Sequence, residues 1–126
     1  MSPQPELLGR VYRFALASHR FFRKLPKNPD AQVPGVQFYK AATSSWANYR
    51  AAQRGRSRAE FIAKLGTAVE ESDEALGWIE FMRDAEIADD GPLLAEAKEL
   101  CAMFTASLMT ARRNSSVPKE GRARHH

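Results

Sequence analysis

The sequence predicts an all-α protein, an antiparallel up-down-up-down four-helix bundle. Alanine and the straight-chain residues that favour helices dominate the composition, and no stretch alternates as a strand does. Apolar residues recur every three or four positions in four stretches of about 20 residues. Segments rich in proline, glycine, aspartate or arginine separate these stretches. Short connections of this kind make successive helices antiparallel neighbours.

The first helix is predicted over residues 5–25. Its core face carries Leu7, Val11, Phe14, Ser18, Phe22 and Leu25. Another face carries a basic row within an arc of about 80°: Arg10, Arg13, Arg20 and Lys24. No acid interrupts this row, so we expect it to contact phosphate groups, with a merely solvated face as the alternative.

Two prolines and an asparagine predict a loop over residues 25–30, and the second helix should begin between residues 31 and 36 and end near Arg54. Its core face carries Phe38, Ala42, Ser45, Trp46 and Tyr49. The small residues at 41–45 predict close packing with a neighbouring helix.

A basic corner follows, in which Ser57 and Glu60 have the Ser-x-x-Glu spacing of a capping box. Gly55 is expected to end the second helix in the left-handed conformation. Four arginines surround the corner and are further candidate phosphate contacts: Arg50, Arg54, Arg56 and Arg58.

The third helix should run from the Ser57 cap to residue 85 or 87. Its core stripe carries Phe61, Leu65, Ala68, Val69, Ser72, Leu76, Ile79 and Met82. Trp78 and Phe81 lie outside that stripe, on the side of an acidic face that includes Glu71 and Glu74. Large aromatic residues outside a core face are typical of interfaces, so these four residues are predicted to join subunits. The alternative is that a loop or the C-terminal tail covers the two aromatic rings.

The fourth helix should begin at an Asp89 or Asp90 cap, with Pro92 in its first turn, and end near Arg113. Residues 1–113 are therefore predicted to form the bundle domain. Residues 114–126 are polar, basic and without periodicity, and we expect a disordered tail.

Charge is strongly segregated along the chain. Residues 1–58 hold eleven lysines and arginines and two acids, a net charge of +9, whereas residues 59–111 hold three and twelve, a net charge of −9. Such asymmetry points to a nucleic acid or to an oppositely charged partner. Alternatively, the two halves neutralise each other within one bundle or between copies.

Several function classes lack support in the sequence. The Glu-x-x-His pairs of di-iron bundles and a phosphate-binding glycine loop are both missing, and Cys101 has no predicted base beside it. We therefore expect no catalytic residue, no metal and no cofactor, and hence no enzyme. A single cysteine fits the reducing cytoplasm, and no apolar run is long enough for a membrane span.

The central residues resemble a known family. Ala-Asn-Tyr-Arg-Ala-Ala at 47–52, Arg-Gly-Arg-Ser-Arg-Ala-Glu-Phe at 54–61 and Val-Glu-Glu-Ser-Asp-Glu at 69–74, followed by Trp78, are similar to the bacterial four helix bundle protein family. This family is also called the ribosomal RNA intervening-sequence protein family. Many relatives have Ala-Glu-Gly where this chain has Arg50-Ala51-Ala52, which suggests a subgroup.

The resemblance implies a four-helix protomer that assembles into a ring-like homopentamer. It also implies similarity to the accessory protein of diversity-generating retroelements, which binds RNA and a reverse transcriptase through basic surfaces. Our hypothesis from the sequence is an oligomeric, non-enzymatic protein that binds nucleic acid, RNA above all, through its basic surface. The alternative is an oligomeric protein-protein interaction scaffold whose basic residues only build the assembly.

Overall fold

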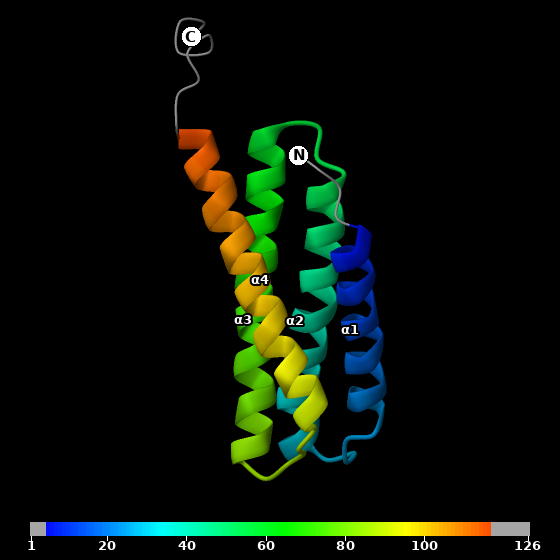
Figure 1. The fold of residues 1–126 in the computed structure, drawn as a ribbon. Coiled ribbons are helices and arrows are strands. Elements are labelled where there is room, and N and C mark those ends of the chain that lie inside the picture. The colour runs from blue at the N-terminus through cyan, green and yellow to red at the C-terminus, as the bar shows by residue number, and fades with distance from the viewer. Residues whose placement is uncertain (1–4, 117–126) are drawn as a thin grey trace, which may run out of the picture.

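The structure is a computed structural model that describes residues 5–116, and it consists of four helices joined by short loops (Figure 1). The helices are α1 (Pro5–Arg23), α2 (Pro29–Gln53), α3 (Arg58–Asp84) and α4 (Gly91–Ser116). The described residues contain no strand, which confirms the predicted all-α four-helix bundle.

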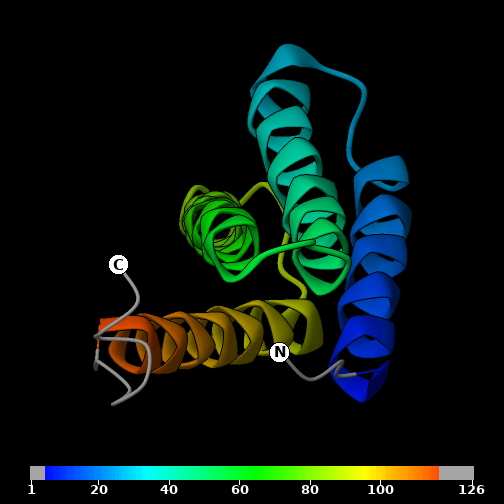
Figure 2. The same cartoon turned by 90° about the horizontal axis from the view of Figure 1, so that it is seen from above.

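The bundle is asymmetric when seen from above (Figure 2). In this view α2 lies between α1 and α3. The fourth helix packs mainly against α3 and meets α1 along its own N-terminal half. Much of α1 therefore has a single helical neighbour, α2, and keeps a wide surface open to solvent.

The core fills the space between all four helices. Phe14 and Phe21 both meet Phe38 edge-on, with ring centroids 6.4 and 5.5 Å apart, and Tyr49 stacks on Phe104 at 4.9 Å. Burial raises the pKa of Tyr49 to about 12. The predicted close packing of α2 is supported by its buried small residues and those of α3: Ala41, Ala42, Ser45, Ala68, Ser72 and Ala75. Five predicted core residues are only partly buried: Phe22, Trp46, Phe61, Val69 and Leu76.

The second helix begins earlier than its prolines suggest. Asn28 caps it, its Oδ1 accepting a hydrogen bond from the Ala31 N–H at 3.0 Å, and Pro29 occupies the first turn. Pro34 lies inside the helix and removes the hydrogen bond that would reach the carbonyl of Asp30, an exposed residue. The predicted start at 31–36 was therefore wrong, because this missing bond falls in the first turns, where water can replace it.

Two predictions concern the corner between α2 and α3: the Ser57 cap is confirmed, and the left-handed conformation of Gly55 is wrong. The Ser57 hydroxyl accepts a hydrogen bond from the Glu60 N–H at 3.0 Å, so Ser57 caps α3 as predicted. Gly55, however, does not have a positive φ. A Cβ at this position would lie 3.1 Å from the backbone nitrogen of Phe61 and 3.2 Å from the carbonyl oxygen of Ala52. Glycine therefore suits this position because there is little space for a Cβ, and not because the backbone has a positive φ.

The left-handed residue of the described chain is Glu86, with φ of 60°, and it ends α3. The Ile87 N–H donates to the Met82 carbonyl at 2.8 Å and the Glu86 N–H donates to the Arg83 carbonyl at 3.0 Å. These two bonds form a Schellman motif, whose left-handed position glycine usually occupies.

Replacing Glu86 by glycine is expected to raise the free energy of unfolding by about 1 kcal/mol, because glycine adopts this conformation without a Cβ clash. Urea unfolding at neutral pH measures the change. Glu86→Ala is the matched control, since it removes the same exposed carboxylate but keeps the Cβ. A glycine variant no more stable than the alanine variant would contradict this account of the helix end.

The fourth helix begins at the Asp90 cap, one of the two predicted, where Oδ1 accepts from the Leu93 N–H at 3.0 Å. It continues to Ser116, beyond the predicted end at Arg113. The helix therefore includes residues 114–116 of the predicted tail, because polarity alone does not end a helix. The rest of the predicted tail, residues 117–126, lies outside the described residues.

Candidate nucleic-acid interface

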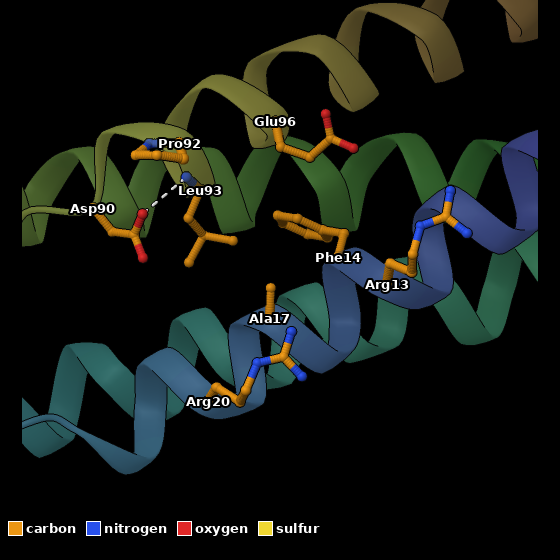
Figure 3. A pocket seen from close by; sticks show the side chains of 8 residues that line it. All are labelled: Arg13, Phe14, Ala17, Arg20, Asp90, Pro92, Leu93 and Glu96. Carbon is orange, nitrogen blue, oxygen red and sulfur yellow. Dashed lines mark hydrogen bonds between the residues drawn. The ribbon is translucent and has the colours of Figure 1, made fainter.

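The basic row of α1 is only partly free to bind a ligand. Arg13, Arg20 and Lys24 are exposed, and no carboxylate within residues 5–116 forms an ion pair with them. Figure 3 shows Arg13 and Arg20 extending from α1 beside a hollow between α1 and α4. These three cations retain their full charge toward solvent.

Arg10, predicted as part of the same row, has a different role. Its Nε donates to Oε2 of Glu96 at 2.7 Å, its Nη2 donates to Oε1 of Glu96 at 2.7 Å, and Nη2 also lies 3.1 Å from Oε1 of Glu99. Both acids raise the pKa of Arg10, and Glu96 has the larger effect. Arg10 therefore joins α1 to α4, and we remove it from the candidate interface because its charge is already neutralised.

The hollow between α1 and α4 has a volume of about 380 Å³. Phe14, Ala17 and Leu93 are among its apolar lining, while Asp90 and Glu96 lie on the α4 side (Figure 3). Asp90 caps α4 and Glu96 holds Arg10, so both acids have structural partners. Their negative charge still disfavours a phosphate inside the hollow, and the outer face of α1 is the better phosphate surface.

The four arginines of the α2–α3 corner gather at one end of the bundle. Arg50 lies in the last turn of α2, Arg54 follows that helix, Arg56 is in the loop and Arg58 is the first residue of α3. No carboxylate in the described chain forms an ion pair with any of them, Glu60 of the first turn of α3 included.

The two helix ends that meet at this corner have opposite effects on cations. The negative end of the α2 dipole stabilises Arg50 and Arg54, whereas the positive end of α3 repels Arg56 and Arg58. An anion bound here would gain from the unpaired guanidinium groups and from the α3 terminus together.

The row and the corner are separate surfaces. Ring contacts place Tyr12 at the level of Trp46 and His19 at the level of Tyr39. Arg54 follows Trp46 by eight residues, a rise of about 12 Å along the bundle. The eight cations predicted as one set therefore divide into a row (Arg13, Arg20, Lys24), a corner (Arg50, Arg54, Arg56, Arg58) and the buttressing Arg10.

The predicted subunit contact of α3 forms a single stripe of Glu71, Glu74, Trp78 and Phe81. Phe81 is 50% exposed, and its ring meets the edge of the partly buried Trp78 ring with centroids 5.7 Å apart. Partial burial, and then the charge of Glu74, raise the pKa of Glu71. The stripe thus combines an exposed aromatic surface with negative charge.

Sequence reasoning missed two sets of exposed side chains. Val33 and Val36 of α2 are 63% and 38% exposed. The charge of Lys40, on the same face of α2, acts to lower the pKa of Glu71, so these two residues lie at the same level of the bundle. Because α2 and α3 are antiparallel, the two valines, which precede Lys40, lie at the level of Trp78, which follows Glu71. The spacing of three and four residues between Val33, Val36 and Lys40 could have revealed this face if α2 had been predicted to start at residue 29.

The second missed set lies along the seam between α1 and α2, where Tyr12, Trp46, His19 and Tyr39 are partly or largely exposed. Trp46 was predicted as a core residue. Only the pairing of the two helices reveals that these rings meet.

No group of three or more histidine, cysteine, aspartate or glutamate side chains is placed to hold a metal ion within residues 5–116. None of the four helices, as far as the structure describes them, is long and apolar enough to cross a membrane.

Within residues 5–116, these observations define an all-α four-helix bundle with two basic surfaces that lack ion-pair partners, an aromatic and acidic stripe on α3, and partly exposed aromatic rings between α1 and α2. The chain is similar to a solved structure from Bacteroides thetaiotaomicron, a protein with unknown function from the S23 ribosomal protein family. The identity is 24%, the match covers 81% of this chain and 97% of that chain, and the TM-score is 0.74. This likeness supports the fold. No protein-family model and no curated protein matches the chain.

Proposed function

We propose that this protein is a non-enzymatic, oligomeric nucleic-acid-binding protein that binds RNA in the cytoplasm. The observation that carries the proposal is the corner, where four arginines lie at the junction of α2 and α3 and no carboxylate within residues 5–116 forms an ion pair with them. The row of Arg13, Arg20 and Lys24 adds a second set of phosphate contacts.

The geometry favours a polyanion over a single small anion. The corner and the row are separated along the bundle, and one ligand reaches both only if it carries several phosphates. Contacts of this kind position a nucleic acid without reading its sequence, and counterion release makes the affinity fall steeply with salt.

The choice of RNA rests on two resemblances. The similar Bacteroides structure belongs to a ribosomal protein family by its description. The central motifs resemble the ribosomal RNA intervening-sequence protein family and the accessory protein of diversity-generating retroelements. By that analogy we propose a ring-like homopentamer and a reverse transcriptase, or another protein, as a possible second partner.

Self-association would use the α3 stripe, which we propose contacts the basic half of a neighbouring copy. Exposed Phe81 supplies apolar area, and Glu71 and Glu74 supply charge opposite to that of α1 and the corner. Charge complementarity of this kind orients two surfaces and suppresses wrong pairings. A head-to-tail contact repeated around an axis closes into a ring.

Replacing Phe81 by aspartate is expected to weaken self-association at least about tenfold, because the variant would bury an unpaired carboxylate in the contact. Sedimentation velocity over a range of protein concentrations measures this. Met109→Asp is the matched control, since Met109 is a similarly exposed apolar residue, at 58%, on α4. Equal association of the two variants would place the subunit contact elsewhere.

Native mass spectrometry of the protein purified without nuclease tests the proposal as a whole. We expect a closed oligomer with added nucleic-acid mass that ribonuclease removes. A closed oligomer that stays free of added mass, and that takes up no RNA when RNA is supplied at low salt, would contradict nucleic-acid binding.

A protein-interaction scaffold is the second candidate function. The exposed apolar side chains of Val33, Val36 and Phe81 favour it, because apolar surface serves assembly and offers nothing to phosphates. A scaffold would form the same oligomer without RNA, and charge-removing substitutions at the corner would leave its other interactions unchanged.

A further inference from the structure

We infer that the seam between α1 and α2 is a stacking platform for the unpaired bases of single-stranded nucleic acid. This inference rests on the proposed function and specifies its ligand, since the basic surfaces alone would accept single strands and duplexes alike.

Aromatic pairs line the seam along its length. The Tyr12 and Trp46 rings lie 5.4 Å apart, the His19 and Tyr39 rings lie 5.6 Å apart, and Phe22 stacks on Tyr39 at 5.1 Å with an interplanar angle of 11°. A contact of 3.1 Å between Nδ1 of His19 and the Tyr39 hydroxyl fixes the second pair. The rings are therefore held in place before any ligand arrives.

These rings are not sealed inside the core. Tyr12 is 48% exposed, neighbouring Leu16 is 38% exposed, and Trp46, His19 and Tyr39 are half-buried. Burying such rings in the core would stabilise the bundle more. The seam instead keeps aromatic surface available to solvent, and none of its rings lines the hollow between α1 and α4.

Positive charge surrounds the seam. Arg13 and Arg20 each follow a seam residue of α1 directly in sequence, but they lie about 100° further around the helix and line the hollow on the α4 side of α1. Arg23 continues the seam beyond His19, and Arg50 continues it one turn beyond Trp46. Neither residues 7–29 nor residues 31–59 contain an aspartate or glutamate. A ligand with a phosphate backbone on one side and planar rings on the other complements this arrangement.

Single strands fit the arrangement better than duplexes do. Tyr12 and His19 are seven residues apart on α1, a rise of about 10 Å, which corresponds to about three base steps of 3.4 Å. Unpaired bases can stack on aromatic side chains, whereas a duplex keeps its base faces stacked internally and presents mainly phosphates to an aromatic surface.

The first test replaces Tyr12 by alanine and measures the affinity for labelled oligouridylate and for duplex RNA of equal length by fluorescence anisotropy. We expect about tenfold weaker binding of the single strand and an unchanged affinity for the duplex. Met109→Ala is the matched control, because Met109 is similarly exposed, at 58%, but lies on α4. Equal losses for both RNAs, or no loss for either, would overturn the inference.

The second test uses the two tryptophans, which lie on different surfaces. Trp78→Phe leaves Trp46 on the seam as the single fluorophore, and Trp46→Phe leaves Trp78 on α3. Oligouridylate should quench the fluorescence of the first variant and leave that of the second unchanged. Quenching confined to Trp78 would overturn the platform.

Failure of the inference is distinguishable from failure of the proposed function. If the corner arginines are needed for RNA binding while Tyr12→Ala and the fluorescence of Trp46 show no response, the stacking platform is wrong and the proposed function stands. If oligouridylate and duplex RNA both fail to bind at low salt, both proposals are wrong. If Tyr12→Ala changes the oligomeric state and not the affinity, the seam is a subunit contact instead.

Discussion

Replacing Arg54 and Arg56 together by glutamine is expected to lower the affinity for single-stranded RNA about 25-fold at about 0.1 M salt. Each phosphate contact to a single strand contributes about 0.7 to the slope of log K against log salt concentration, so two lost contacts change the slope by about 1.4. At about 0.1 M salt, one logarithmic unit below the 1 M reference, this change of slope lowers log K by about 1.4. Fluorescence anisotropy with labelled RNA measures the change. Because both side chains are exposed and without ion-pair partners in the described chain, the bundle itself should keep its stability.

The matched control is the Arg83→Gln/Lys98→Gln variant. It removes the same amount of charge from the acidic half of the chain, where Arg83 is paired with Asp84 at 2.9 Å. If net charge alone attracts RNA, the two double variants lose affinity equally. A loss confined to the Arg54/Arg56 variant assigns the binding to the corner, and equal losses would contradict it.

Replacing Phe104 by alanine is expected to lower the free energy of unfolding by about 3–5 kcal/mol. The Phe104 ring is 1% exposed and stacks on Tyr49, which is 2% exposed, so the truncation leaves a cavity and removes a ring contact at the meeting point of α2 and α4. Urea unfolding followed by circular dichroism measures the loss.

Met109→Ala, on the same helix but 58% exposed, is the control and should change stability by less than about 0.5 kcal/mol. A loss below about 1 kcal/mol for Phe104→Ala would mean that α4 does not pack on the bundle as described. The comparison therefore tests the placement of α4 against the rest of the bundle.

Much of the fold follows from local chemistry that a sequence displays. The periodic apolar residues mark all four helices, and Ser57 and Asp90 mark two of their starts because their side chains satisfy backbone N–H groups nearby in sequence. Pro34 and Gly55 misled the prediction for a common reason. Each residue type permits several backbone roles, and the surrounding chain decides among them.

The candidate site was less predictable because its features depend on pairs of helices. A helical wheel places Arg10 and Arg13 on one basic face, yet Glu96, far along the chain, neutralises the first and not the second. The aromatic seam likewise exists only where α1 lies beside α2, and Trp46 had the spacing of a core residue. The corner was predictable as a cluster, since its four arginines lie close together in sequence.

The most direct test of the central claim is the salt dependence of RNA binding by the unmodified protein, measured by anisotropy on an oligouridylate probe. If the corner alone binds phosphates, log K should fall with log salt concentration with a slope of about −3, and with a slope of about −5 if the row also contributes. A slope near zero, or no binding at about 50 mM salt, would contradict a function in nucleic-acid binding.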